Sequence, residues 1–509
     1  MKLATGKTII IAVVCVLVAA AVIAALLFGT NTYTTQQKET SSGSTAFPST
    51  TPSATGNGEL GNTVTGQGPE PADGKKVLNV YSYDDELEMV IGKYIKLHPE
   101  FDYEINFVYL PLVDEYITLS LINQNLPGDA EAVVDIYSVP GAYASHFIKG
   151  EMSDYACTYK ELGIDVEEAL NKADIPQYVI DAGTNPDGEL IALPYKPYAN
   201  VFVYRRSIAK KVFGTDDPDK IAEIIGGGSE SWDKFREAAQ KLKQHGYYIV
   251  PGCDDLSVMF DNSIYVSDAA MGVNPAWEEF MELSKAFYDQ GFIADIKSSQ
   301  EWDMYLNGKG DKQAFGFFII LDAIDSSRPD YLLGDTADDW AICLPPFKTA
   351  DNTMTGIMVN RNSPHKGVLG PLIEWITLDC SENGLQYHMA TDTFFNQGDD
   401  MSLYEPYGRH RLVVSGSVLQ NTSTCLDHLG GQNVNPVIYE ALRTPSRMTY
   451  SGAIPQRRLF NLWLEETQAY IRGEKSRDAA IRDYLKRAEE EKAWLEETFE
   501  KYVMSHLLP

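Results

Sequence analysis

The sequence lacks the motifs by which most catalytic and metal-binding sites are recognised. Its 509 residues contain no Gly-x-Ser-x-Gly elbow, no His-Glu-x-x-His pair and no phosphate-binding glycine loop. Six cysteines are present, none in C-x-x-C spacing, so the sequence predicts neither a disulfide framework nor a zinc site. We therefore expect a protein that is not an enzyme and that uses no metal and no cofactor.

Basic residues are scarce as well. The chain carries 42 Lys and Arg against 72 Asp and Glu, a formal net charge of -30. Nucleic acids and anionic membrane surfaces bind basic patches, so neither is expected as a partner, and the acidic excess predicts a self-repelling, monomeric protein. Aromatic residues are plentiful by contrast, with 29 Tyr, 20 Phe and 7 Trp. Such rigid, half-polar side chains suit ligand-binding clefts.

One long run without charge occurs at residues 9–28. About 20 apolar residues are enough to cross a bilayer as a helix. Lys2 and Lys7 precede the run and no charge follows it closely, so the positive-inside rule places the N-terminus in the cytoplasm. We predict a cytoplasmic segment at 1–7 and a single-pass transmembrane helix at 8–28, with the main domain extracellular. A cleaved secretory signal, which has a shorter apolar region, remains the alternative.

Residues 29–75 are mostly Ser, Thr, Gly and Pro and hold few large apolar groups, so they predict a disordered linker. From residue 76 onward the pattern changes to short β-branched runs that alternate with amphipathic helices. We expect strands at 77–81, 103–109 and 132–139, with helices at 87–95 and 113–123 between them. Strands that alternate with helices in this way predict an α/β fold with a mainly parallel sheet.

The later chain continues in the same mixed manner. We expect strands at 189–195, 201–206, 314–320, 340–344 and 356–360, and helices at 231–244, 274–290, 459–473 and 476–503. The last of these helices carries charges of both signs, which is typical of a solvated helix face.

Ligands of parallel sheets bind outside the carboxyl ends of the strands. This rule selects Tyr83 and Asp84 after the first expected strand, and Tyr143 after the third. Two simpler roles stay open, because Asp84 can cap the following helix and Tyr143 can pack within its own helix.

Several short stretches, taken together, carry a resemblance to a known family. They are residues 188–195 (GELIALPY), 203–206 (VYRR), 231–235 (SWDKF) and 429–433 (LGGQN). In their order and spacing they resemble the extracellular solute-binding proteins of bacterial ABC importers, specifically the carbohydrate-binding group, family 1. The likeness covers roughly residues 77–487.

The resemblance implies a two-lobed periplasmic-binding-protein-like α/β fold with a hinge of crossing strands. By analogy, residues 76–509 form the solute-binding domain, in which the first lobe takes about 76–185 and a return near 312–330, and the second lobe takes the remainder. It also implies a membrane-anchored extracellular receptor that captures a sugar or oligosaccharide between its lobes and delivers it to an ABC transporter permease.

Sugars stack their apolar faces on aromatic rings and exchange hydrogen bonds with carboxylates and amides. The resemblance places the turn 195–200 where family members often touch ligand, with Tyr198 as the first candidate. One departure concerns the aromatic platform that usually follows the strand matched by 315–318, since this chain continues with Ile319 to Asp322. The expected ligand-binding residues are Tyr83, Asp84, Tyr143, Tyr195, Tyr198, Asn200, Trp302, Phe318, Asp322 and Gln432.

Other interpretations remain open at this point. Phe318 can belong to the core, Asn200 can satisfy its own turn, and Gln432 can shape the loop around it. A glycan-active enzyme would need two carboxylates about 5 to 9.5 Å apart, for which adjacent pairs such as Asp254 and Asp255 are candidates by residue type alone. An adhesin or sensor module would use the charged C-terminal helix to pair with another protein.

Overall fold

The computed structural model describes residues 76–110, 121–130, 133–139, 146–260, 273, 275–324, 334–351, 356–394, 411–443, 447–449 and 454–498. The expected transmembrane helix at 8–28, the linker at 29–75 and Tyr143 all lie outside these residues. Within the described part of the chain, no helix combines the length and the apolar character that a membrane crossing requires. The cysteines at five described positions are free thiols.

The first sheet contains four strands in the order β2-β1-β3-β8. They are β1 (Lys76–Ser82), β2 (Tyr103–Tyr109), β3 (Ile136–Ser138) and β8 (Ile357–Val359). β1 runs parallel to β2 and β3, and β8 runs antiparallel to β3. The parallel arrangement expected for the first three strands is confirmed. Residue 82 pairs with residue 109, so β1 and β2 end at the same edge of the sheet.

Burial on both faces explains why this sheet is so apolar. Leu78 and Val80 of β1 enter one hydrophobic cluster, whereas Tyr81 of β1 and Tyr137 of β3 enter another. Helix α2 (Glu86–Leu97) connects β1 to β2 and buries the stripe that contains Leu87. The short strands β3 and β8 are buried at every position, whereas β1 and β2 include polar residues such as Asn79 and Glu104 and β2 is only half-buried.

The second sheet contains β4 (Asn200–Arg205), β5 (Gly316–Ile320) and β6 (Trp340–Cys343), with β4 in the middle. Both neighbours run antiparallel to β4. The expectation of a mainly parallel sheet, which was drawn from the strands before residue 140, does not extend to this half of the molecule. The sequence signal fails here because long helical connections allow a following strand to return in either direction.

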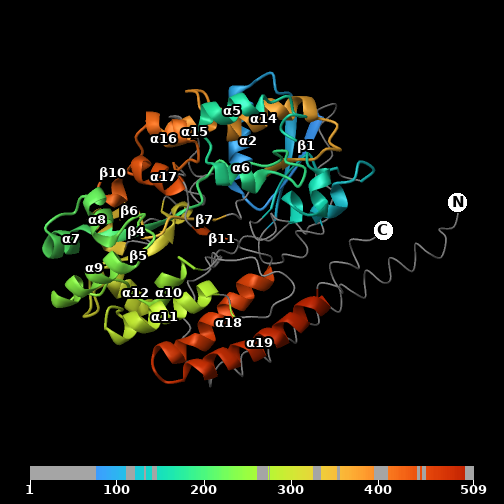
Figure 1. The fold of residues 1–509 in the computed structure, drawn as a ribbon. Coiled ribbons are helices and arrows are strands. Elements are labelled where there is room, and N and C mark those ends of the chain that lie inside the picture. The colour runs from blue at the N-terminus through green and yellow to red at the C-terminus, as the bar shows by residue number, and fades with distance from the viewer. Residues whose placement is uncertain are drawn as a thin grey trace, which may run out of the picture. The chain divides into compact units, whose positions relative to one another are not determined.

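Helices and short 3-10 segments surround the second sheet. They are α7 (Arg206–Phe213), α8 (Pro218–Ile225), α9 (Asp233–Gln244), α10 (Cys253–Ser257), α11 (Pro275–Asp289), α12 (Ser299–Leu306), η3 (Leu321–Ala323) and η4 (Gly334–Asp339). The C-terminal helices α18 (Ile454–Ile471) and α19 (Arg477–Thr498) run side by side, and α18 packs on α11 (Figure 1). The two C-terminal helices were expected from the sequence, and the structure confirms them.

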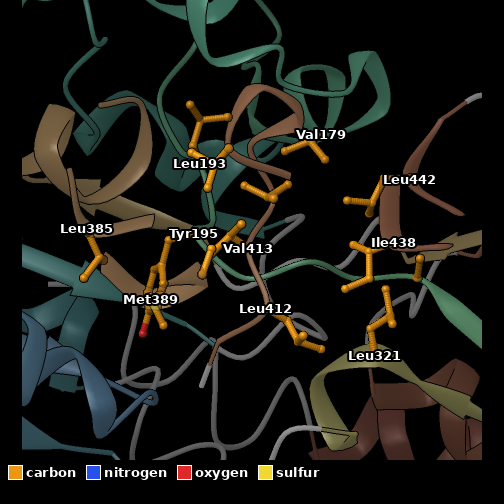
Figure 2. Close-up of a cluster of buried hydrophobic side chains, with 14 of the residues drawn as sticks. Val179, Leu193, Tyr195, Leu321, Leu385, Met389, Leu412, Val413, Ile438 and Leu442 are labelled. Atoms are coloured by element: carbon orange, nitrogen blue, oxygen red, sulfur yellow. The ribbon is translucent and has the colours of Figure 1, made fainter. Parts of the chain in front are cut away.

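The remaining elements follow β3 or β8 in the chain. They are η2 (Glu151–Tyr155), α5 (Val166–Ala173), α6 (Gln177–Gly183), α14 (Lys366–Thr377), α15 (Leu385–Ala390), α16 (Gly416–Asn421), β9 (Cys425–Leu426), η6 (Asp427–Leu429), β10 (Gln432–Asn433) and α17 (Asn435–Leu442). Helix α14 contacts α2 and β8, and α16 contacts α5 and α17. Leu385 and Met389 of α15 share one buried cluster with Tyr195 and Val413, which come from two other stretches of chain (Figure 2).

The chain returns to the first sheet at a different place from the one expected. Residues 316–320 form β5 and belong to the second sheet, whereas β8 at 357–359 joins the first. The strand that joins the first sheet is therefore β8, and the lobe boundary near 312–330 stays a prediction. A separate pair of short strands, β7 (Thr349–Asp351) and β11 (Arg447–Thr449), runs in parallel. Residues 189–195, expected as a strand, make only isolated bridges such as Leu193 to Ile357 within the described chain.

Candidate functional site

The loop after β1 lies where the strand-end rule places a ligand site. The Tyr83 amide donates to the Ser138 carbonyl at 3.2 Å, so the loops that follow β1 and β3 meet at the carboxyl edge of the first sheet. Asp84 Oδ1 accepts from the Glu86 amide at 3.2 Å. The N-cap residue of α2 is Asp85, which makes no side-chain capping bond, so the Asp84 bond is a local turn contact that fixes the direction of its carboxylate.

The same carboxylate is contacted by the turn that precedes β4. The Tyr195 hydroxyl donates to Asp84 Oδ2 at 2.9 Å, and Lys196 Nζ lies 3.4 Å from Asp84 Oδ1. Lys196 also forms an ion pair with Glu86. The side chains of Lys196 and Asp84 are only 10% and 16% exposed, so solvent screens this network weakly. Two segments more than 100 residues apart in the chain are thus joined at one strand end.

Burial raises the pKa values of two side chains at this strand end. It raises the pKa of Asp85, and the neighbouring charge of Asp84 adds to that increase. Burial raises the pKa of Tyr195 well above its usual value, followed by the charges of Asp84 and Glu86. Tyr195 therefore stays protonated and remains a donor to Asp84. The edge presents carboxylate oxygens that can accept hydrogen bonds from hydroxyl groups.

The far end of the turn reaches the second sheet. The Leu321 amide donates to the Ala199 carbonyl at 2.9 Å, which holds the end of β5 beside the turn. Ile320, the last residue of β5, is 37% exposed. Asp322 lies in the 3-10 segment that follows β5. The backbone of residues 319–322, where family members usually place an aromatic ring, therefore adjoins the turn.

Tyr198 stands between these two ends. Its ring is half-buried and packs against the core, while its carbonyl accepts from the Tyr178 hydroxyl at 3.3 Å. Asn200, in contrast, is buried and donates to Thr349 Oγ1 at 2.7 Å and to the Val258 carbonyl at 3.3 Å. Asn200 therefore links β4 to β7. The structure brings Tyr195 together with Asp84, leaves Tyr198 three residues further along the same turn, and gives Asn200 a structural bond.

Three expected residues lie elsewhere and are engaged in packing. Trp302 makes edge-to-face contacts with the rings of Tyr305 and Phe317 at 5.4 and 5.6 Å. Phe318 is fully buried in the aromatic cluster on one face of the second sheet. Gln432 donates to the Ile342 carbonyl and accepts from the Ile342 amide, both at 2.9 Å. These contacts favour the structural alternatives for Phe318 and Gln432, and they engage Trp302, expected only as a ligand contact, in packing.

Three residues that were not predicted from the sequence also lie at this edge of the sheet. Tyr109, the last residue of β2, lies opposite Ser82 and is 48% exposed. The strand-end rule that selected Tyr83 would have selected Tyr109 as well. Lys196 and Glu86 were missed because an ion pair between distant segments leaves no local pattern in the sequence.

Comparison with solved structures identifies the fold. A crystal structure described as extracellular solute-binding protein family 1 aligns with 82% of this chain and 99% of its own, at 14% identity and a TM-score of 0.58. The sugar-binding protein MalE from Xanthomonas citri aligns with 84% of this chain and 99% of its own, at 14% identity and a TM-score of 0.52. The galacto-N-biose-/lacto-N-biose I-binding protein of the ABC transporter from Bifidobacterium longum, in complex with lacto-N-biose, aligns with 85% and 99%, at 12% identity and a TM-score of 0.51.

No protein-family model and no curated protein matches the chain. The structural likenesses establish the fold, which is the two-lobed α/β fold of periplasmic binding proteins. The resemblance to extracellular solute-binding proteins of sugar ABC importers, first seen in the short sequence stretches, is thereby confirmed at the level of structure.

Proposed function

We propose that this protein is a membrane-anchored extracellular receptor that captures a sugar or oligosaccharide and delivers it to an ABC permease. The observation that carries the proposal is the contact between two distant segments at Asp84, which accepts from Tyr195 and faces Lys196. This contact lies at the carboxyl edge of the first sheet, the place where ligands bind in open α/β sheets.

The residues at this edge have the chemistry that a sugar requires. The Asp84 carboxylate is held in a fixed direction and can accept from sugar hydroxyls. Tyr198 and Tyr109 retain ring surface on which an apolar sugar face can stack. Tyr83 and Tyr143 complete the proposed contacts on the first lobe. Tyr195 then supports the site by holding Asp84.

The remaining expected residues divide into one ligand contact and four structural residues in this proposal. Asp322 is retained as a ligand contact because its backbone follows the strand end beside the turn. Trp302, Phe318, Asn200 and Gln432 act through packing and hydrogen bonding in the scaffold.

The proposed delivery of sugar to a permease is supported by the similar proteins, and the proposed membrane anchoring is supported by the sequence. Two of the similar solved structures support this part of the proposal. One is a binding protein of an ABC transporter in complex with lacto-N-biose, and the other is described as a sugar-binding protein. The apolar run at 8–28 would anchor the receptor, and the linker at 29–75 would let the domain reach a permease in the same membrane.

A thermal-shift screen of the purified chain against mono- and oligosaccharides, with lacto-N-biose as its first member, tests the proposal. A sugar present at 100 times its dissociation constant should add about 2.7 kcal/mol to the free energy of unfolding. Stabilisation by at least one sugar, and none by peptides of similar size, is the expected result. A shift with peptides alone would contradict sugar capture.

A further inference from the structure

A cavity lies beside the turn 195–200, because Tyr178 and Val414, which line it, donate hydrogen bonds to the carbonyls of Tyr198 and Tyr195. Its volume is about 290 Å³, and it lies between the connection from α5 to α6, the helix α16 and the end of α17. Its wall combines the apolar side chains of Ile175, Leu419 and Leu442 with the charged side chains of Asp174 and Arg443. Small-molecule pockets begin at about 300 Å³, so this cavity suits a small ligand.

The acidic side of the cavity is held by backbone geometry. Asp174 ends α5 with a φ of 52°, in the left-handed region. A side chain at position 416 would bring a Cβ within 2.4 Å of Asp174 Oδ2, so only glycine lets α16 approach this carboxylate. Gln420 Nε2 and the Tyr439 hydroxyl donate to the same oxygen at 3.2 and 3.4 Å.

The basic side is formed by Arg443. Its Nη2 donates to Asp174 Oδ2, and its guanidinium lies 4.1 Å from the centre of the Tyr439 ring. Stacking and the ion pair together fix the plane of the guanidinium. Arg443 is 42% exposed on its side chain, so the cavity wall is open to small solutes at this point.

Both charged groups keep unused hydrogen-bonding capacity. Every hydrogen bond that Asp174 accepts through its side chain from the described residues goes to Oδ2, which leaves Oδ1 available. Among those residues, Arg443 has an acceptor only for Nη2, which leaves its Nη1 edge available. The cavity thus offers an acceptor and a charged donor beside an apolar wall.

We propose that this cavity binds a small zwitterion with an apolar side chain, an α-amino acid of about the size of leucine. The ligand carboxylate would accept from Arg443 Nη1, and its ammonium would donate to Asp174 Oδ1. The side chain would lie against Ile175, Leu419 and Leu442. Asp174 and Arg443 already pair with each other, and what this pair leaves over is one acceptor oxygen and one charged donor. A zwitterion can engage both groups at once, whereas a simple anion or cation can engage only one of them.

The test is a calorimetric titration of the full-length chain, in detergent micelles, with L-leucine. Leucine should bind about tenfold or more tightly than 4-methylpentanoate, which lacks the ammonium, and than leucinol, which lacks the carboxylate. Equal binding of the three compounds, or no heat with leucine at millimolar concentration, would overturn the proposal.

Two substitutions place the binding in the cavity. Leu419→Phe takes up cavity volume and should weaken leucine binding about tenfold or more, whereas the volume-conserving control Leu419→Met should leave it unchanged. Arg443→Gln should weaken it by a similar factor while thermal unfolding confirms a folded chain. Leucine binding that survives both Leu419→Phe and Arg443→Gln would overturn the assignment.

Discussion

Asp255, on α10, shows how strongly burial acts on a single residue. Its side chain is almost fully enclosed, and burial raises its pKa to about 8 from the ordinary 3.8, although the Gly252 amide donates to Oδ2 at 2.6 Å and opposes the increase. The folded protein therefore holds a proton on Asp255 that the unfolded chain releases above about pH 4. The free energy of unfolding contributed by this group is fully present below pH 4 and is lost as the pH rises to about 8.

Asp255→Asn should remove that part of the pH dependence. The amide keeps an acceptor for Gly252 and cannot ionise, so the variant should lose less stability than the wild type between pH 4 and pH 8, by at most about 5 kcal/mol. Denaturant unfolding at several pH values measures the difference. The exposed Asp187→Asn serves as the control, and parallel curves for the wild type and Asp255→Asn would contradict the buried-proton interpretation.

Gln432 offers a test of a residue with two competing assignments. Its two hydrogen bonds to the Ile342 backbone are buried, so Gln432→Ala leaves a buried donor and acceptor unmatched. We expect a loss of about 1 to 3 kcal/mol in the free energy of unfolding and unchanged sugar affinity. Urea unfolding and sugar titration measure the two quantities. Lost affinity at full stability would instead place Gln432 in contact with the ligand.

The candidate site could be predicted from the sequence only in part. Asp84 and Tyr195 were found because strand ends and a family-like turn are visible as local patterns. The ion pair of Lys196 with Glu86 was not, since it joins segments that are distant in the chain. Phe318 was misleading for a physical reason: both faces of the second sheet are buried, so inward and outward residues of β5 look alike in sequence.

At the scale of elements, close contact between strands sets the tolerance for substitution. A Cβ at Gly316 of β5 would lie 2.1 Å from the Val203 carbonyl oxygen of β4. Gly316→Ala should therefore destabilise the protein by about 1 to 3 kcal/mol. Thermal or denaturant unfolding measures the loss.

Gly367 provides the matched control within a helix. An added Cβ there meets no atom within 4 Å, and the residue lies in the first turn of α14. Gly367→Ala should leave stability unchanged or raise it by up to about 1 kcal/mol, because alanine loses less backbone entropy in a helix. Equal effects of the two substitutions would show that β4 and β5 are not packed as described.

The positions of helices and strands in the chain were easier to predict than the pairing of the strands. The helix α2 and the strands β1 and β2 follow from hydrophobic periodicity, and β2 has the bounds that its pattern predicts. The antiparallel second sheet and the return of the chain through β8 did not follow. Periodicity records which residues are buried, and it carries no information about the strand direction or about which strand lies alongside.

At the scale of the whole molecule, the first 75 residues and the described domain have separate tasks in the proposed receptor. Removal of residues 1–75 should move the protein from the membrane fraction to the soluble fraction, because the apolar run at 9–28 is lost. Sugar affinity should stay unchanged, since the proposed contacts all lie beyond residue 76. Fractionation and titration measure both results, and a truncated chain that folds but no longer binds would contradict this division.

The central claim is that a sugar is held at the turn between the two lobes, and calorimetric titration of Tyr198→Ala tests it most directly. With the sugar that stabilises the wild type most, Tyr198→Ala should bind about tenfold or more weakly, because it removes the half-buried ring that the turn 195–200 offers for stacking. Tyr387→Ala, at a half-buried tyrosine on α15, should bind like the wild type, and the two variants should melt at similar temperatures. Unchanged affinity of Tyr198→Ala together with a large drop in its melting temperature would contradict the claim.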